Sequence, residues 1–280
     1  MTPALSIILP ANDEAAHIAL CLEAVLGSDP LERDAPVQIV VVPNGCRDET
    51  AQIARSFESV ANTRGWMLDV IELSEGSKVA ALNAGDRAAK APSLAYLDAD
   101  VIVSPALLAQ TACALSSDTP RYVSGEVRLS DTRNLVTRAY GLFYLQTPFM
   151  KQTAPGCGFF AMNRIGRARW ANWPAIISDD TFARLNFAPN ERQQVDAPYD
   201  WPLVEGMRNL VRVRRRQNAG VDEIAHRFPA LIKNDAKSRF SLTAVLRAAL
   251  RHPLGFCVYG IVALSVRLKP ARNNGWDRGR

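Results

Sequence analysis

The sequence predicts an α/β protein of three layers, in which a mostly parallel central sheet lies between two layers of helices. Through the first 100 residues, short apolar segments alternate with segments of helical periodicity, which is typical of βαβ units and a parallel sheet. Turn residues separate these segments. After Arg121 the alternation becomes irregular, but no linker-like stretch follows. We therefore expect a second lobe that packs on the same sheet.

The elements are justified in chain order by their apolar spacing and their end signals. The first strand ends at Pro10, and the helix after it stops at Gly27. The turn at residues 43–45 leads from the second strand into a helix whose buried face should include Ile53, Phe57 and Val60. The expected strands cover residues 5–9, 37–42, 67–73 and 94–97, and the expected helices begin near Ile18, Asp48 and Lys78, the last of them covering residues 78–90.

The composition is that of a globular protein. The chain has 280 residues, 48% of them hydrophobic, so it can bury a large core in one or two domains. The net charge is +5, but the basic residues gather toward the C-terminus without interleaved aromatic residues, so we expect no nucleic-acid partner. The five cysteines form no CxxC pair, which indicates neither a zinc site nor a disulfide framework.

The C-terminal region combines apolar and basic residues. An uncharged run of about 13 residues, 254–266, is shorter than the roughly 20 residues that span a bilayer. Two interpretations have equal support, a core helix with solvated ends and an interfacial membrane anchor. No basic N-terminal region of a signal peptide is present, so we expect a cytoplasmic protein, with a peripheral position at the cytosolic face of a membrane under the second interpretation. The flanking basic residues are Arg247, Arg251, Arg267, Lys269 and Arg272.

Two carboxylates follow the fourth expected strand, where Asp98 and Asp100 flank Ala99. Side chains two apart on a strand leave the same face, and the ligand crevice of an open α/β sheet lies outside the carboxyl ends of its strands. Magnesium is commonly held by one or two carboxylates together with substrate phosphates. A plain turn is the alternative, because aspartate bonds its own backbone and starts turns.

Four segments in this order resemble the family-two inverting glycosyltransferases of GT-A fold, which have a Rossmann-like three-layer α/β/α architecture. They are residues 10–14 (PANDE), 44–50 (NGCRDET), 76–85 (GSKVAALNAG) and 98–100 (DAD), and the resemblance covers about residues 5–220. It implies a nucleotide-diphosphate sugar as donor and Mn²⁺ or Mg²⁺ held against the diphosphate. Asp100 is then the best metal ligand, with Asp98 at the metal or the ribose. The residues implied at the donor are Pro10, Asn12, Glu14, Asn44, Lys78, Asp98, Ala99 and Asp100.

Single residues in this set have plainer alternatives. Lys78 lies near a helix start, where an anionic ligand is favoured, but it could be an ordinary exposed lysine. The sequence also departs from the family pattern, because Pro43-Asn44 replaces the common Asp-Asp, and Asn12 replaces a common aromatic residue. A uridine base is therefore not implied, since base discrimination rests on such hydrogen bonds and stacking.

The second half supplies a candidate base. Residues 176–182 (IISDDTF) resemble the family's Glu-Asp acceptor motif, which puts Asp180 at the position of the base and Asp179 beside it. Inverting transfer is a displacement at the anomeric carbon, so a base opposite the leaving diphosphate must take the proton of the acceptor hydroxyl. A serine before acids is also an ordinary helix start. Gly156, Cys157 and Gly158 are expected at the acceptor, where glycine lets the backbone approach a sugar closely, with a tight turn as the alternative.

A run of arginines follows near residue 214. The family often places an arginine-containing stretch here that closes over the donor, and we expect Arg214 and Arg216 to form such a diphosphate loop. Arginine suits this role because its planar fork binds oxyanions bidentately, although a solvated basic face is the alternative. The QxxRW signature of processive synthases is absent, which favours transfer of a single sugar.

The sequence thus predicts a metal-dependent inverting glycosyltransferase that acts on a glycan, polysaccharide or lipid-linked acceptor. Residues 1–120 would bind the nucleotide sugar, residues 121–235 would bind the acceptor, and residues 236–280 would form a helical tail that contacts a membrane or packs on the domain. A nucleotidyltransferase-like enzyme is one alternative, but its usual glycine-rich, arginine-containing loop is missing between Leu9 and Ile18. A non-catalytic protein that binds nucleotide sugars is the other.

Overall fold

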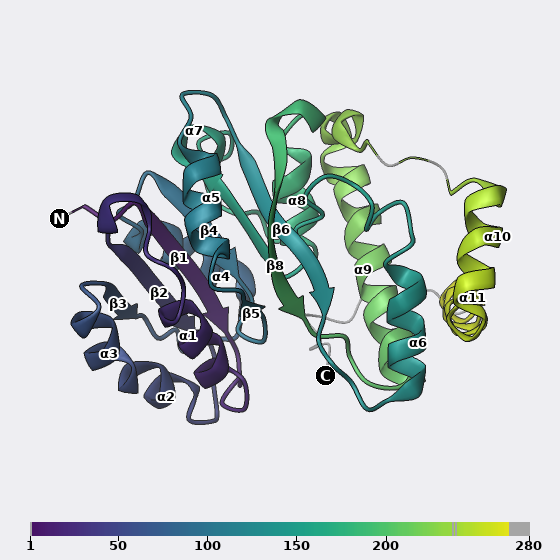
Figure 1. The fold of residues 1–280 in the computed structure, drawn as a ribbon, viewed down its shortest axis with the longest axis horizontal. Coiled ribbons are helices and arrows are strands. Elements are labelled where there is room, and N and C mark those ends of the chain that lie inside the picture. The colour runs from purple at the N-terminus through teal and green to yellow at the C-terminus, as the bar shows by residue number, and fades with distance from the viewer. Residues whose placement is uncertain (1, 237, 239, 269–280) are drawn as a thin grey trace.

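The computed structural model describes residues 2–236, 238 and 240–268, and Figure 1 shows their arrangement. Within this part of the chain, eight strands form one sheet in the order β3-β2-β1-β4-β7-β6-β8-β5. The strands are β1 (Leu5–Ala11), β2 (Val37–Pro43), β3 (Met67–Val70), β4 (Ser93–Leu97), β5 (Ile102–Val103), β6 (Tyr122–Leu129), β7 (Phe159–Asn163) and β8 (Arg192–Trp201).

The two halves of the sheet differ in strand direction. Strands β3, β2, β1 and β4 are all parallel, as the alternating pattern predicts. Strand β7 runs antiparallel to β4 and to β6, β8 is parallel to β6, and β5 is antiparallel to β8. The chain leaves β1 toward β2 on one side and later enters β4 on the other. This is a topological switch point, and ligands of open α/β sheets bind outside the carboxyl ends of such strands.

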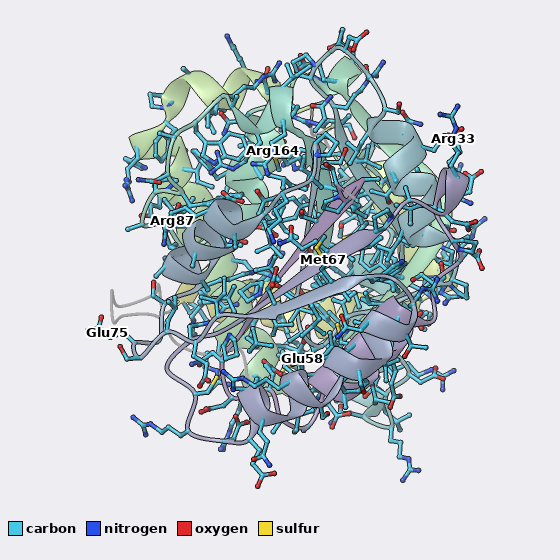
Figure 2. All side chains as sticks on the ribbon, turned by 90° about the vertical axis from the view of Figure 1, so that its left-hand side faces the viewer. Arg33, Glu58, Met67, Glu75, Arg87 and Arg164 are labelled. Atoms are coloured by element: carbon cyan, nitrogen blue, oxygen red, sulfur yellow. The ribbon has the colours of Figure 1, made fainter. Side chains whose placement is uncertain are left out.

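The helices cover both faces of the sheet. Their bounds are α1 (Ile18–Leu26), α2 (Thr50–Ser56), α3 (Glu58–Thr63), α4 (Lys78–Ala88), α5 (Leu107–Leu115), α6 (Leu135–Tyr144), α7 (Arg164–Arg167), α8 (Asp179–Leu185), α9 (Met207–Arg227), α10 (Leu242–Arg251) and α11 (Pro253–Leu268). Short 3-10 turns lie at Glu32–Asp34, Pro189–Glu191 and Pro229–Asn234. Figure 2 looks at the edge strand that carries Met67, with the helix of Glu58 on one side of it and the helix of Arg87 on the other.

Strict alternation along the strands explains the layers. Ile7 and Leu9 of β1 belong to the core cluster under α1 and α5, whereas Ile8 between them joins a second cluster with residues of α4 and α8. Both sets are fully buried, as expected for a sheet that is covered on both faces. The three-layer α/β/α expectation is therefore confirmed.

A third apolar cluster lies beyond the end of the sheet, among α6, α9 and α11. Tyr140 and Tyr144 of α6, Leu210 of α9, and Val258 and Val262 of α11 are buried there. In Figure 1 these helices stand at the side of the molecule opposite β3. The C-terminal helix thus packs on the domain along one face. None of the helices in the described ranges is long and apolar enough to cross a membrane, and Lys269 and Arg272 lie outside those ranges.

Two local expectations are wrong. The expected helix after β2 breaks at Phe57 into α2 and α3, and the break shifts the helical phase so that Val60 is 51% exposed while Ile53 and Phe57 pack against the core. The third strand ends at Val70, before the expected residue 73. Leu73 still donates to the carbonyl of Pro43, but a proline has no N–H with which to continue a regular ladder.

A buried ion pair joins the two halves of the fold. The carboxylate of Asp86 on α4 accepts hydrogen bonds from the guanidinium of Arg167 (Nε 2.8 Å), the indole of Trp173 (2.8 Å) and the hydroxyl of Tyr96 (2.6 Å). Both charged side chains are about 10% exposed. Arg167 also donates to the carbonyl of Trp170 (2.6 Å), so this one pair fixes the segment that leads toward α8.

We expect Arg167→Met to lower the free energy of unfolding by about 3–5 kcal/mol, because the Asp86 charge would stay buried without its partner. Urea unfolding followed by circular dichroism measures this. Arg55→Met is the matched control, since it breaks an ion pair with Glu72 whose side chains are about half exposed, and it should cost less than about 1 kcal/mol. Equal losses for the two variants would contradict the role of the buried pair.

Candidate functional site

The loops after β1 and β2 and the start of α4 are tied together by one buried amide. Asn44 is 1% exposed, and its Nδ2 donates to the carbonyl of Ala11 at the end of β1 (2.8 Å). Its Oδ1 accepts from the N–H of Ser77, the N-cap of α4 (2.9 Å). Its backbone carbonyl accepts from the side chain of Asn12. Asn44 therefore holds in place the loops that carry the residues predicted to bind the sugar donor. Pro10, another of these residues, is also buried.

The Asp98 segment is a turn at the carboxyl end of β4. The Asp98 carbonyl accepts from the N–H of Val101 (3.1 Å), and the Asp98 N–H donates to the carbonyl of Gly158 (2.9 Å). Asp98 and Asp100 are partly exposed, whereas Ala99 is 4% exposed and belongs to the core. The turn interpretation is thus correct for the backbone, and it leaves both carboxylates at the ligand edge of the sheet. It also joins this segment to the predicted acceptor loop.

Lys78 connects the two predicted carboxylate groups. Its Nζ lies 2.9 Å from Oδ1 of Asp98 and 3.2 Å from Oδ2 of Asp179. Burial by itself would lower the pKa of Lys78, but the carboxylates of Asp179 and Asp98 raise it above its usual range. The ammonium is therefore charged at neutral pH. Asp98 and Asp179, 81 positions apart in the sequence, therefore meet at one cation.

The acidic pair opens α8. Asp179 is 7% exposed, and Asp180 is partly exposed and accepts from the N–H of Thr181 (2.6 Å). Burial and the neighbouring carboxylate of Asp179 raise the pKa of Asp180 to about 6, although Lys78 opposes the shift. Such a carboxyl is ionised at neutral pH and still basic enough to accept a proton in a reaction.

The predicted acceptor loop packs tightly against this site because two of its residues are glycine with positive φ. Gly156 has φ +77°, and a Cβ there would lie 2.0 Å from Oη of Tyr122. Gly158 has φ +73°, and a Cβ there would lie 2.9 Å from the indole of Trp201. The thiol of Cys157, between them, is buried, and its pKa is raised by burial and then by Asp180. The loop therefore lies close enough to the candidate base for the charge of Asp180 to affect it.

Sequence reasoning missed three polar residues beside this loop. Among the described residues, Oη of Tyr122, Nε2 of Gln152 and Nε of Arg184 are buried and have no hydrogen-bond partner. Arg184 is 2% exposed and donates through Nη1 to the Oε1 of Gln152 (2.7 Å). Its place one helical turn after Asp180, on the same face of α8, was a usable signal. Unsatisfied buried donors are costly, so this corner stands out among the described residues.

The arginine stretch is not a loop. Residues 207–227 form the single helix α9, so the expectation of a diphosphate loop is wrong in its conformation. Arg214 stacks over the ring of Tyr144 (5.4 Å), which holds it against α6, and it acts electrostatically on Cys157. Arg215 donates to the carbonyl of Ser265 on α11 (2.7 Å). A contact of Arg214 or Arg216 with a diphosphate stays a prediction.

Two groups of side chains could be considered as ligands of a cation. Asp13, Cys46 and Asp48 bring ligand atoms within 4.8 Å of one another. However, Asp48 accepts from the N–H of Ala15 (3.0 Å) and from Thr50. Burial alone would raise the pKa of Asp48, but these hydrogen bonds hold it below its usual value. This group therefore fastens the loops after β1 and β2 to each other.

Asp98 and Asp100 fit a divalent cation better. They are partly exposed oxygen donors at the ligand edge, and two carboxylates are what magnesium commonly uses when substrate phosphates complete its shell. Glu14, also expected here, lies on the neighbouring loop, where its N–H donates to Thr50 (2.8 Å) and its carboxylate contacts His17 (3.2 Å).

Comparison with known proteins identifies the family and the fold of the chain. A family model described as Glycosyl transferase family 2 matches residues 6–182. The chain is 33% identical over 98 residues to the glycosyltransferase AglE of Haloferax volcanii and 32% identical over 101 residues to a 4,4'-diaponeurosporenoate glycosyltransferase of Staphylococcus aureus. Each match covers 35% of this chain and only 31% and 24% of those relatives.

Solved structures share the fold at low sequence identity. A mannosyltransferase from Pyrobaculum calidifontis, in complex with GDP-Man and Mn²⁺, has a TM-score of 0.60 and 19% identity, over 97% of this chain and 77% of that one. TarS of S. aureus, in complex with UDP-GlcNAc, has a TM-score of 0.53 and 16% identity, over 94% and 81% of the two chains. These are GT-A glycosyltransferases, and the expected fold class is confirmed.

We expect Asp180→Asn to raise the melting temperature at pH 8 by about 3–6 °C and to leave it unchanged near pH 4. The folded-state pKa of Asp180, about 6, lies above the unfolded value of 3.8. The wild type therefore loses stability as the pH rises through this interval, because the partly buried carboxyl must ionise beside Asp179. Asparagine removes that loss. Differential scanning calorimetry from pH 4 to pH 8 measures the effect, and a pH-independent difference would contradict it.

Proposed function

Because the chain belongs to glycosyl transferase family 2, we propose that it moves one sugar from a nucleotide-diphosphate donor to an acceptor hydroxyl with inversion at the anomeric carbon. The observation that carries this proposal is Lys78, which lies within 3.2 Å of both Asp98 and Asp179. It brings the acid at the donor end of the sheet next to the acids that open α8. Glycosyl transfer needs charged groups at the leaving phosphate and a base at the incoming hydroxyl, and the two sets of groups must lie close together.

The donor is assigned to the carboxyl ends of β1, β2 and β4. Asn12 and Glu14 line this edge, Asn44 holds their loops in place, and the α4 N-terminus favours an anion. Lys78 is charged and placed to contact a diphosphate oxygen. The two solved structures hold GDP-Man and UDP-GlcNAc, which supports a nucleotide sugar here without choosing the base.

Asp98 and Asp100 are the residues that would hold Mn²⁺ or Mg²⁺. When bound, the cation would offset the negative charge that grows on the departing diphosphate. Lys78 forms an ion pair with Asp98 and so adds a positive charge beside the proposed cation site. The Mn²⁺ bound by the Pyrobaculum enzyme supports this assignment.

Asp180 is assigned as the general base. Its carboxylate takes the proton of the acceptor hydroxyl while the acceptor oxygen forms a bond to the anomeric carbon, and the bond from that carbon to the diphosphate oxygen breaks with its electron pair. Asp179, nearly buried and paired to Lys78, keeps Asp180 basic by raising its pKa. Asp179 thus positions and tunes the base.

The acceptor is assigned to the corner between the 156–158 loop and α8. Tyr122, Gln152 and Arg184 offer buried donors that hydroxyl or other oxygens of a glycan or lipid-linked acceptor would satisfy. Trp201 lies against Gly158 and provides an aromatic face at the same place. Aromatic side chains of this kind present both an apolar surface and a hydrogen-bond donor.

We expect Asp180→Asn to keep donor binding and to lower the rate of transfer by about 10²–10⁴-fold, because it removes only the proton acceptor. Asp100→Ala should weaken both metal-dependent donor binding and turnover. Calorimetry with GDP- and UDP-sugars plus Mn²⁺, together with donor hydrolysis, measures these steps. Asp118→Asn, at an exposed position, is the matched control and should behave as wild type.

Two outcomes would reject the proposal in different ways. Donor binding without metal dependence or turnover would favour a non-catalytic sugar-nucleotide-binding protein. Release of pyrophosphate from a nucleoside triphosphate would favour a nucleotidyltransferase. Retained transfer in Asp180→Asn would remove that residue from the role of base while leaving the enzyme class intact.

The pH dependence gives a separate prediction. We expect kcat/KM to rise with pH and to level off above an apparent pKa near 6, because only ionised Asp180 accepts a proton. Lys78→Met should move this value upward, since Lys78 opposes the rise in the pKa of Asp180. Initial rates from pH 5 to pH 9 measure both. A rate that does not change between pH 5 and pH 7 would contradict the assignment.

A further inference from the structure

The last two helices present an apolar surface that the fold does not use. Leu242, Leu246 and Leu250 lie one turn apart on α10 and are 74%, 55% and 85% exposed. On the neighbouring helix α11, which contacts α10, the residues Leu254, Ile261, Leu264 and Leu268 are also exposed. We name these seven residues the tail surface. Large apolar side chains exposed in this number on two neighbouring helices are uncommon on soluble proteins and indicate a binding face.

The opposite side of α11 already holds the tail to the domain. Val258, Val262 and Val266 are buried against α6 and α9. Gly255 packs so closely that a Cβ there would lie 2.4 Å from the carbonyl of Ala139. Arg215 of α9 donates to the carbonyl of Ser265. The helix is therefore fixed in orientation, and its exposed leucines are not needed for folding.

The charged residues in the segment that carries the tail surface are all basic. From Leu242 to Leu268 the sequence contains no aspartate or glutamate. Arg247 and Arg251 form a second row on α10, each one position after a leucine of the tail surface, and Arg267 stands near the end of α11. All three are exposed. Apolar side chains bordered by arginines are the composition of helices that lie in the interface of anionic membranes.

The lengths of the helices exclude a spanning arrangement for the described residues. Helix α10 has 10 residues and α11 has 16, so they extend over about 15 Å and 24 Å, less than the roughly 30 Å of a hydrocarbon core. Figure 1 shows both helices at one end of the molecule, where a flat surface could approach them. The geometry suits contact along the surface of a bilayer.

We propose that the tail surface docks into the interface of a bilayer that contains anionic lipids, with the leucines among the acyl chains and Arg247 and Arg251 at the phosphates. Such docking does not require the proposed activity, but it would bear on the acceptor. Helix α11 packs on α6 and α9, whose Tyr144 and Arg214 interact electrostatically with Cys157, so docking would hold the acceptor loop on the side of the lipid surface.

Co-sedimentation of the full chain with vesicles tests the proposal without any assay of activity. We expect binding to phosphatidylcholine vesicles with about 30 mol% phosphatidylserine and much weaker binding to phosphatidylcholine alone. Leu246→Glu/Leu250→Glu should lower binding at least tenfold, and Arg247→Gln/Arg251→Gln should lower binding to the anionic vesicles by about 30-fold. Both pairs are exposed, so circular dichroism and the melting temperature should stay as in the wild type.

Leu20→Glu is the matched control, because Leu20 is 59% exposed on α1, on another side of the molecule, and its loss should leave vesicle binding unchanged. Binding that ignores lipid charge, or that survives both double variants, would overturn the proposal. So would a dimer in sedimentation velocity that Leu246→Glu/Leu250→Glu dissociates while the wild type ignores vesicles. In that case a second copy of the chain covers the tail surface.

Discussion

The buried carboxylate of Asp86 is the constraint on which the placement of the site depends. It lies on α4, in the parallel half of the fold, and it binds Arg167 and Trp173 of the second half together with Tyr96 of β4. A buried charge allows few alternative arrangements, because the loss of any hydrogen-bond donor leaves the charge without compensation for its desolvation and destabilises the fold. The segment after β7 is thereby held over α4, and α8 begins beside Lys78.

Lys78 then faces an excess of negative charge. One ammonium stands among Asp98, Asp179 and Asp180, and burial together with the carboxylate of Asp179 raises the pKa of Asp180 to about 6. In a stable core such crowding would be a defect. At the ligand edge of the sheet, the crowding leaves Asp180 with a carboxyl that exchanges protons near neutral pH. A bound cation would reduce the repulsion between the carboxylates there. The same packing that joins the halves therefore supplies the chemistry.

Much of the fold could be predicted from the sequence, because its signals are local. Alternating burial on β1, the proline and glycine stops, and acidic residues after β4 all follow from a few neighbouring residues. The errors occurred where a single distant or cumulative effect decided the outcome. Val60 is exposed because a break at Phe57 changed the helical phase, and the arginines near 214 lie on a long helix because α6 and α11 pack against it.

The sequence by itself determined which residue types follow which strands, since turn and strand patterns are written in consecutive positions. Asp98, Asp100 and Asp180 could be identified in this way, with the aid of a family resemblance. Only the tertiary structure decided which of them meet. Lys78 contacts Asp98 and Asp179, which lie in distant parts of the sequence. Folding also decided the burial of Asn44 and the position of the unpaired donors of Tyr122, Gln152 and Arg184. Such contacts depend on how the sheet closes and on where two apolar clusters pack, and no local pattern encodes that.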